Sequence, residues 1–149
     1  MKVLVQRSNN ASCTVDSKLV SKIDSGLVLF VGFTNNDDGN IIDYMVNKVI
    51  NLRIFEDENN VMNKSILDYG GEILSISQFT LYGDASDGNR PSYINAMKSK
   101  DAINLYNEFN NILRNYGIVV ETGKFGALME VNIINDGPTT IWLESRKKW

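Results

Sequence analysis

The strongest constraint on the fold is a nearly continuous apolar run after Gly26, with the sequence Leu27-Val28-Leu29-Phe30-Val31-Gly32-Phe33. A run of this length without regularly spaced polar positions is typical of a β-strand that is buried on both faces. We therefore expect this strand to lie in the centre of a sheet. The rest of the chain must then supply neighbouring strands and the elements that cover the sheet.

Other segments have the composition of strands. Residues 2–7 alternate between apolar and polar, and Asp16-Ser17-Lys18 joins the run from Ala11 to Val15 to Leu19–Ile23, as in a β-hairpin. Further strands are predicted at residues 52–55, 72–81, 118–121, 128–134 and 139–143.

Two segments have helical periodicity. Apolar residues recur every three to four positions over 41–50, where Asp37 and Asp38 are candidate caps, and over 96–116, which Gly117 ends. The order contains no repeating βαβ unit. We therefore predict one α+β domain over residues 1–149, with a largely antiparallel, barrel-like sheet and two main helices.

The composition excludes several kinds of chemistry. The chain has no histidine, so a hydroxyl or thiol activated by imidazole is excluded and a zinc site is not expected. Cys13 is the single cysteine, which excludes an internal disulfide. We expect no metal and no organic cofactor, so any catalysis must use hydroxyls, carboxylates, backbone groups or the substrate itself. No apolar run approaches the length of about 18 residues that a membrane span needs, and we expect a cytoplasmic protein.

The charge of the chain limits its partners. A net charge of −3 argues against a broad nucleic-acid footprint, although gripping only the end of a nucleic acid needs few cations. Scattered basic residues are available for such contacts, or are ordinary surface charges: Arg53, Lys64, Arg90, Lys124 and Arg146-Lys147-Lys148. Gly70-Gly71-Glu72 lacks the lysine and the helix of a phosphate loop, so nucleotide-driven chemistry has no support.

The first candidate site is Ser77-Gln78-Phe79-Thr80, in the strand predicted at 72–81. Strict alternation places Ser77 and Phe79 on one face of that strand and Gln78 and Thr80 on the other. One interpretation is a half-exposed strand whose polar side chains face water. The other is a strand end whose hydroxyls and N–H groups hold a carbonyl oxygen as it becomes an oxyanion. Without an imidazole nearby, Ser77 or Thr80 is a poor nucleophile, which favours positioning over covalent catalysis.

The second candidate site is Asn135-Asp136-Gly137-Pro138, between two predicted strands. All four residues are common in turns, so an ordinary β-turn is one interpretation. The other is a rigid Gly-Pro unit that presents its carbonyls at the mouth of a pocket and discriminates ligands by shape.

Together these segments resemble the D-aminoacyl-tRNA deacylase family, also called D-tyrosyl-tRNA(Tyr) deacylases, over nearly the full chain. The matching segments are Val5-Gln6-Arg7, Asn51-Leu52-Arg53-Ile54-Phe55, Gly70-Gly71-Glu72-Ile73-Leu74, Ser77-Gln78-Phe79-Thr80-Leu81-Tyr82-Gly83-Asp84, Arg90-Pro91-Ser92, Thr122-Gly123-Lys124-Phe125-Gly126 and Asn135-Asp136-Gly137-Pro138. Thr139 departs from the family's usual hydrophobic residue after the Gly-Pro and leaves the motif itself intact.

The resemblance implies a homodimer with active sites at the subunit interface, each binding the 3′ aminoacyl end of tRNA. It implies a cis Gly137-Pro138 unit that enters the partner's pocket and selects D-amino acids, braced by Arg7. It also implies that Ser77, Gln78, Phe79 and Thr80 face the ester. The resemblance further implies that the adenosine lies among four residues of a later segment: Phe125, Gly126, Ala127 and Met129.

Two functions follow from the motifs and the resemblance. The first is a hydrolase that cleaves D-aminoacyl-tRNA, and glycyl-tRNA as a side substrate, while rejecting L-aminoacyl-tRNA. The second is a non-catalytic nucleic-acid-binding dimer with the same fold. Both motifs are intact, and a pure binding protein would have no need of Gly137-Pro138, which favours the hydrolase.

Overall fold

The computed structural model describes residues 1–145, so the basic segment Arg146-Lys147-Lys148 lies outside the described residues. The elements, in chain order, are β1 (Lys2–Val15), β2 (Lys18–Ile23), β3 (Gly26–Gly32), α1 (Gly39–Ile50), β4 (Phe55–Glu56), β5 (Met62–Lys64), α2 (Ile66–Tyr69), β6 (Glu72–Ser77), the 3-10 helix η1 (Phe79–Tyr82), α3 (Ser99–Asn115), β7 (Val120–Thr122) and β8 (Glu130–Glu144).

Six strands form one mixed sheet in the order β2-β1-β3-β6-β7, with β8 paired to β1. β1 is antiparallel to β2, β3 and β8, whereas β3, β6 and β7 run parallel to one another. The prediction of a largely antiparallel sheet is therefore wrong for this half. Parallel neighbours need crossover connections, and here α1 with the β4–α2 segment and then α3 supply two crossovers of unequal length, which produce no repeating sequence pattern.

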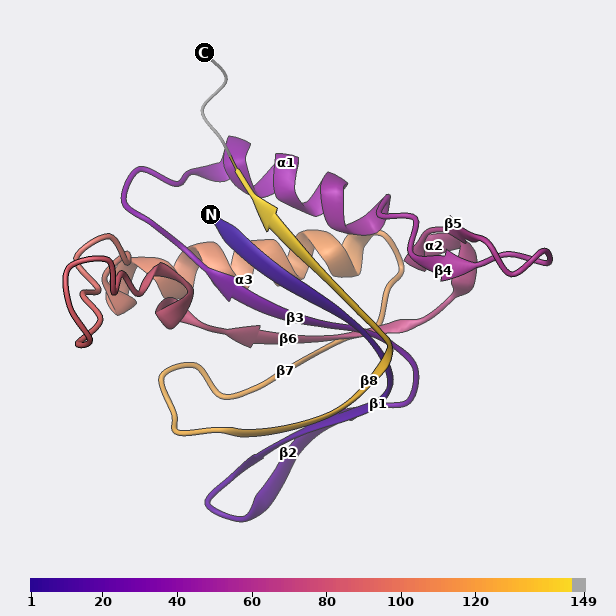
Figure 1. Ribbon diagram of the computed structural model, residues 1–149, viewed down its shortest axis with the longest axis horizontal. Coiled ribbons are helices and arrows are strands. Elements are labelled where there is room, and N and C mark those ends of the chain that lie inside the picture. Colours follow the sequence, from indigo (N-terminus) through magenta and orange to yellow (C-terminus); the bar gives the residue numbers. More distant parts are fainter. Residues whose placement is uncertain (146–149) are drawn as a thin grey trace.

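The sheet curls into a nearly closed, barrel-like form because one edge of β1 has two partners. Its first half pairs with β3 and its second half with β2, while the other edge pairs with β8 along most of its length. In Figure 1, α1 and α3 lie on one side of the sheet, and β2 with the first half of β8 curls away below it.

Strand β3 is central and buried on both faces, as its apolar run predicts. Leu27, Leu29 and Val31 face the core shared with α1 and α3. Val28 packs into a second core with Leu74 of β6, on the other face of the sheet. The alternation of a single strand thus serves two cores, which explains why its sequence has no polar face.

The two main helices form close to their predicted bounds. Asp38 is the N-cap of α1, where its Oδ1 accepts from the backbone N–H of Ile41 at 3.1 Å. Gly117, with a φ of +80°, follows the end of α3. The structure adds a short third helix, α2, which has a capping box between Ser65 and Asp68. Within residues 1–145, no helix has the length and apolar character required to cross a bilayer.

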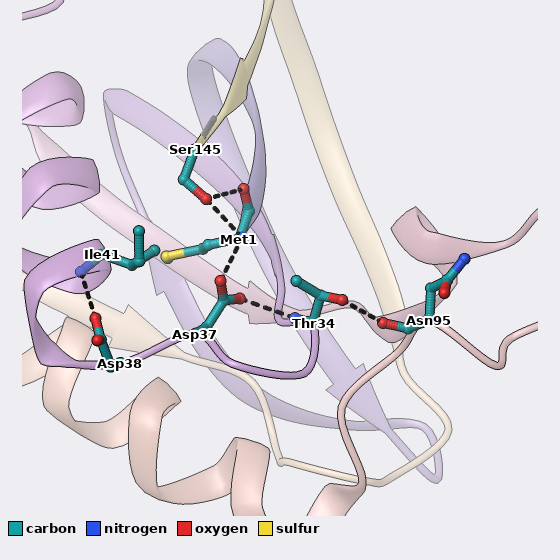
Figure 2. A network of polar contacts seen from close by, with 7 residues as sticks. All are labelled: Met1, Thr34, Asp37, Asp38, Ile41, Asn95 and Ser145. Atoms are coloured by element: carbon teal, nitrogen blue, oxygen red, sulfur yellow. Dashed lines mark hydrogen bonds and ion pairs between the residues drawn. The ribbon is translucent and has the colours of Figure 1, made fainter. Parts of the chain in front are cut away.

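The start of β1 is fastened by a polar network that joins distant parts of the chain (Figure 2). The buried Met1 α-ammonium group lies 2.9 Å from Asp37 Oδ1 and donates to Ser145 Oγ at 2.7 Å. The other oxygen of Asp37 accepts from the Thr34 N–H at 2.8 Å, and Thr34 Oγ1 donates to the Asn95 carbonyl at 2.6 Å. The network therefore holds together the ends of β1 and β8 and the segment that leads into α3.

Both predicted strands that carry candidate motifs have different bounds in the structure. β6 ends at Ser77, and residues 79–82 form η1 instead of continuing the strand. The reason is that β3 ends at Gly32, so the chain has no ladder partner beyond Ser77 on that side. The strands predicted at 128–134 and 139–143 are in contrast one strand, β8, because β1 is long enough to pair with both halves.

Candidate active site

A cleft of about 390 Å³ opens where β6 and β7 end. Because these strands are parallel neighbours, with Ser75 paired to Thr122, their carboxyl ends lie at the same edge of the sheet. The lining residues come from β3, β6, η1, α3, β8 and the segments that connect them: Val31, Gly32, Phe33, Ile76, Ser77, Gln78, Phe79, Met97, Ser99, Ala102, Phe125, Gly126, Ala127, Leu128, Met129 and Val131. The cleft thus brings together two groups of candidate residues that are distant in the sequence.

The first motif lines this cleft because the backbone turns at the end of β6. Ser77 is the last residue of β6, and the Gln78 N–H donates to the Val31 carbonyl at 2.7 Å. The chain then turns into η1, so Ser77, Gln78 and Phe79 all line the cleft. Their predicted division between two faces is wrong because alternation ends where the strand ends.

Thr80 lies beside the cleft and is not among its lining residues. It is exposed, and its Oγ1 accepts a hydrogen bond from Gln78 Nε2. The Thr80 hydroxyl is therefore engaged with the motif's own amide. Nothing in this contact increases the nucleophilicity of the hydroxyl, because an amide donor withdraws electron density from the oxygen and removes no proton.

The wall of the cleft is fixed by Tyr106 of α3. Its hydroxyl donates to the Ser75 carbonyl at 2.7 Å, and its ring lies 5.6 Å from the ring of Phe125. The same carbonyl accepts from the Gly123 N–H at 3.3 Å. Burial raises the pKa of Tyr106 above its usual value, so the hydroxyl keeps its proton at neutral pH and remains a donor. Tyr106 thereby ties the end of β6 to the segment that carries Phe125.

The side chains that line the cleft carry no charge. None of the residues that line it, all within the described part of the chain, has an ionisable side chain. Across residues 1–145, no group of three or more histidine, cysteine, aspartate or glutamate side chains is placed to hold a metal ion. The cleft offers hydroxyls, one amide, backbone groups and apolar surface, which position a substrate and stabilise charge by hydrogen bonding.

The rim of the cleft exposes large apolar side chains. Leu128 is 93% exposed and Phe79 is 57% exposed, although both line the cleft. Phe79 packs edge-on against Tyr93, with ring centroids 5.1 Å apart. Exposed apolar groups gathered at the mouth of a cavity are typical of a surface that binds a ligand or another protein.

The second motif is a bulge in β8. Ser8 pairs with Asn135 and Gln6 pairs with Thr140, so residues 136–139 together stand opposite Arg7. The Gly137–Pro138 peptide bond is cis, as the family resemblance implies, and both residues are exposed. The interpretation as an ordinary turn between two strands is wrong, because β8 runs through the motif.

Asn135 fastens both sides of this bulge. Its Nδ2 donates to the Arg7 carbonyl at 2.9 Å and to the Thr139 carbonyl at 3.0 Å. Its Oδ1 accepts from Gln6 Nε2 at 3.2 Å and from Thr140 Oγ1 at 3.1 Å. The Asn135 side chain thus bonds to β1 on one side and to the residues that end the bulge on the other.

Arg7 is buried behind the bulge, with 8% of its surface exposed. Its Nη1 donates to the Ile54 carbonyl at 2.7 Å, and its Nε lies 3.0 Å from Asp136 Oδ2 as an ion pair without hydrogen-bond geometry.

Gly137 has a φ of +114°, and a Cβ there would lie 2.7 Å from the Thr139 nitrogen. The bulge accepts only glycine at this position without a shift of its own backbone.

The two motifs do not meet within one chain. Arg7 and Asp136 line a different cavity of about 210 Å³, together with residues from β1, β4, α2 and the turn before β3: Ser8, Ser25, Phe55, Glu56 and Tyr69. Of the residues in the described chain, none lines both cavities, and Gly137 and Pro138 line neither. The structure therefore brings Ser77, Gln78 and Phe79 together with the segment from Phe125 to Met129. It leaves Arg7, Gly137 and Pro138 apart from that cleft.

Several cleft residues were not predicted from the sequence. Gly32 is the last residue of β3, and Met97, Ser99 and Ala102 belong to the start of α3 and the segment before it. The single signal in the sequence was the glycine at the end of an otherwise bulky strand, since isolated glycines in strands mark close backbone approach. A Cβ at Gly32 would lie 2.8 Å from the Gln78 carbonyl oxygen.

Comparison with known proteins places this geometry in a family. The family model described as D-Tyr-tRNA(Tyr) deacylase matches residues 4–144. A protein of Geobacillus sp. (strain WCH70) named D-aminoacyl-tRNA deacylase is 53% identical, covering 99% of this chain and 97% of its own. One of Bacillus cytotoxicus with the same name is also 53% identical, covering 98% of this chain and all of its own. The chain belongs to the D-Tyr-tRNA(Tyr) deacylase family.

Two solved structures share the fold of this chain. The structure of a protein named c-Myc DNA Unwinding Element Binding Protein has a TM-score of 0.93 at 42% identity, covering 99% of this chain and all of that one. The structure of a probable eukaryotic D-amino acid tRNA deacylase has a TM-score of 0.80 over 95% of this chain and 97% of that one. Its identity is 17%, so it shows the shared fold alone.

Proposed function

We propose that this chain hydrolyses the ester bond of D-aminoacyl-tRNA, releasing free D-amino acid and tRNA, and that it rejects L-aminoacyl-tRNA. The observation that carries the proposal is family membership over residues 4–144 together with relatives at 53% identity that bear the deacylase name. Glycyl-tRNA is a further substrate in this proposal, because glycine has no side chain for a steric filter to reject. Since aminoacyl-tRNA is used in the cytoplasm, we place the enzyme there.

The cleft is suited to this reaction because ester hydrolysis can proceed without an ionisable protein group. In the proposed mechanism, the Ser77 hydroxyl, the side-chain amide of Gln78 and the Phe79 N–H hold the carbonyl oxygen as negative charge develops on it, because the Gln78 backbone N–H is already bonded to Val31. A water molecule, oriented by a hydroxyl of the tRNA itself, attacks the carbonyl carbon and gives up a proton. The carbon–oxygen bond to the ribose then breaks, and the departing oxygen takes a proton. Thr80 orients Gln78 through the hydrogen bond between their side chains.

The other wall of the cleft supports a site for the terminal adenosine. Phe125 supplies an aromatic face, Gly126 and Ala127 leave space, and Met129 adds a polarisable apolar contact. Stacking on an aromatic ring contributes about 1–3 kcal/mol per base and needs no charge. An acidic protein can therefore bind the end of tRNA without a basic face.

We further propose that the active protein is a homodimer in which Gly137-Pro138 of one subunit enters the cleft of the other. Both residues are exposed on a braced bulge, both are absent from their own cleft, and the cleft has an exposed apolar rim. In this arrangement the Gly137 and Pro138 carbonyls bind the α-amino group of the D-amino acid. They leave no room for a side chain of the opposite configuration.

The alternative, a non-catalytic nucleic-acid-binding dimer, is not favoured. One protein of solved structure, at 42% identity, is named for DNA binding. The relatives at 53% identity carry the deacylase name, and this chain retains both motifs.

The test is deacylation of D-tyrosyl-tRNA, L-tyrosyl-tRNA and glycyl-tRNA in parallel, with and without chelator. We expect rapid loss of the D ester, measurable loss of the glycyl ester, no loss of the L ester above background, and no effect of chelator. Light scattering of the same sample should give the mass of a dimer. If no ester is cleaved while tRNA is still bound, the hydrolase proposal fails and the binding protein becomes the better account.

A further inference from the structure

The short helix η1 carries Phe79 and Thr80, but it is weakly held by packing. All four of its residues are half-buried or exposed. Its start is tied to the sheet by the hydrogen bond from the Gln78 N–H to the Val31 carbonyl, and Gly83 N–H closes its last turn onto the Thr80 carbonyl at 2.9 Å. A segment with this little burial needs other contacts to keep one orientation.

Lys2 of β1 supplies such contacts at the opposite end of η1. Its Nζ donates to the Leu81 carbonyl at 3.2 Å. The ammonium group also lies 4.4 Å from the ring centroid of Tyr82 and 5.4 Å from that of Trp142, which is in β8. Hydrogen bonding to a helical carbonyl and cation–π attraction both favour this position of the charge.

The sheet register places Lys2 beside Gly32, which η1 also contacts. Lys2 pairs with Gly32 across β1 and β3. A Cβ at Gly32 would lie 3.3 Å from Leu81 Cβ and 3.4 Å from Tyr82 Cδ2, so η1 lies directly on this pair of residues. The backbone of Gly32 limits how closely η1 approaches the sheet, and the ammonium group of Lys2 holds its last turn there.

We propose that Lys2 is a positioning residue for the deacylation reaction, acting through η1 on the orientation of Gln78 and Thr80. This inference rests on the proposed function. Lys2 does not line the cleft, so it acts without touching the substrate. Without the ammonium group, the Leu81 carbonyl loses its donor and η1 adopts other orientations. The fraction of molecules with a productive site then falls, because catalysis depends steeply on the placement of its groups.

A different role for a lysine near a tRNA-binding cleft is a phosphate contact. The two roles predict different kinetics. A phosphate contact lowers affinity when it is lost, so its removal raises KM, and this effect weakens as the salt concentration rises. A positioning residue changes kcat while the binding of the tRNA end stays the same.

The experiment compares Lys2→Met, Lys2→Arg and Lys48→Met with the unmodified protein. Lys48 is a matched control, because it belongs to α1 and its Nζ lies 5.5 Å from the ring centroid of Tyr44 in the same helix. For Lys2→Met we expect kcat on D-tyrosyl-tRNA to fall roughly tenfold with KM within about twofold. Lys2→Arg should recover most of kcat, since a guanidinium also donates to a carbonyl and stacks on aromatic rings. Lys48→Met should behave as the unmodified protein.

Hydrogen exchange gives a second readout that does not depend on activity. The Gly83 amide reports on η1, and in Lys2→Met we expect it to exchange several-fold faster than in Lys48→Met. An unchanged exchange rate overturns the proposal, even if the unmodified protein proves inactive on every ester. So does an unchanged kcat, or a rise in KM alone that vanishes at high salt. Absence of activity in the unmodified protein counts against the proposed function and leaves the exchange result to decide the role of Lys2.

Discussion

The two motifs of this protein are held in place in opposite ways. The bulge at Gly137-Pro138 is fastened from within and from behind, by the four hydrogen bonds of Asn135 and by the buried Arg7. The segment Ser77–Thr80 lies where a strand ends, and η1 is positioned by contacts with Gly32 and Lys2 of the neighbouring strands. One motif is a rigid unit of the sheet, and the other is a short segment laid against it.

This difference matches the tasks we propose for the two segments. A filter that rejects by shape must keep its carbonyls fixed, because a displaced wall would admit the wrong enantiomer. A segment that stabilises developing charge needs correct orientation in the bound complex, and small adjustments of an exposed turn can supply it. Damage to the rigid motif should therefore cost selectivity or all activity, and damage to the supports of the other should lower turnover.

The largest effect is expected for Gly137→Ala. A Cβ at this position lies 2.5 Å from Thr139 Oγ1 and 2.7 Å from the Thr139 nitrogen, so the bulge must shift. We expect deacylation of D-tyrosyl-tRNA to fall roughly 10²-fold, and the free energy of unfolding to fall by about 1–3 kcal/mol. Gly88→Ala is the matched control, because Gly88 has a similar φ of +111° with open space around it. A Gly137→Ala protein of normal activity would show that the bulge has no part in the reaction.

The second-largest effect is expected for Gly32→Ala, which tests the contact between η1 and the end of β3. The added methyl group would lie 2.8 Å from the Gln78 carbonyl oxygen and push the segment outward. We expect kcat to fall about tenfold, with about 1–3 kcal/mol of stability lost to overpacking. Steady-state kinetics and urea unfolding measure both. Gly39→Ala is the control, since its Cβ would meet only the flexible carboxylate of Glu108 at 3.3 Å.

Arg7→Lys should have a smaller effect, directed at selectivity. A lysine has one nitrogen and cannot reach both the Ile54 carbonyl and Asp136 as the guanidinium does. We expect the ratio of D to L cleavage to fall several-fold, chiefly because the L ester begins to react, and stability to fall by about 1–3 kcal/mol. Arg53→Lys, at an exposed arginine that bonds to Asn63, is the control and should leave the ratio unchanged. An unaltered ratio in Arg7→Lys would mean that the bulge keeps its shape without this brace.

The smallest effect is expected for Thr80→Ala. Its hydroxyl accepts from Gln78 Nε2, so its loss should lower turnover by about threefold or less, and Thr80→Ser should restore it. Removing a true nucleophile from an enzyme costs on the order of 10⁶ in turnover. A Thr80→Ala protein that binds the tRNA end normally and has no measurable turnover would reopen covalent catalysis by this residue.

The predictions from sequence succeeded where the pattern is local. The apolar run of β3, the cap and stripe of α1 and the glycine after α3 each depend on neighbours within a few residues, and all three appear as expected. The assignment of Ser77 and Gln78 to opposite faces failed. It assumed a strand through residue 81, and that depends on whether β3 offers a partner there.

The sequence alone determined that any chemistry here avoids imidazole, that the chain has a doubly buried strand, and that two polar motifs interrupt its β regions. The tertiary structure decided the parallel half of the sheet, the meeting of the first motif with residues 125–129 in one cleft, and the separation of Gly137-Pro138 from that cleft. It also decided the contacts of Arg7 with Ile54 and of Lys2 with Leu81. The physical reason is that propensity and periodicity act over one or two turns of chain, whereas these contacts join segments whose proximity depends on how the whole sheet is paired.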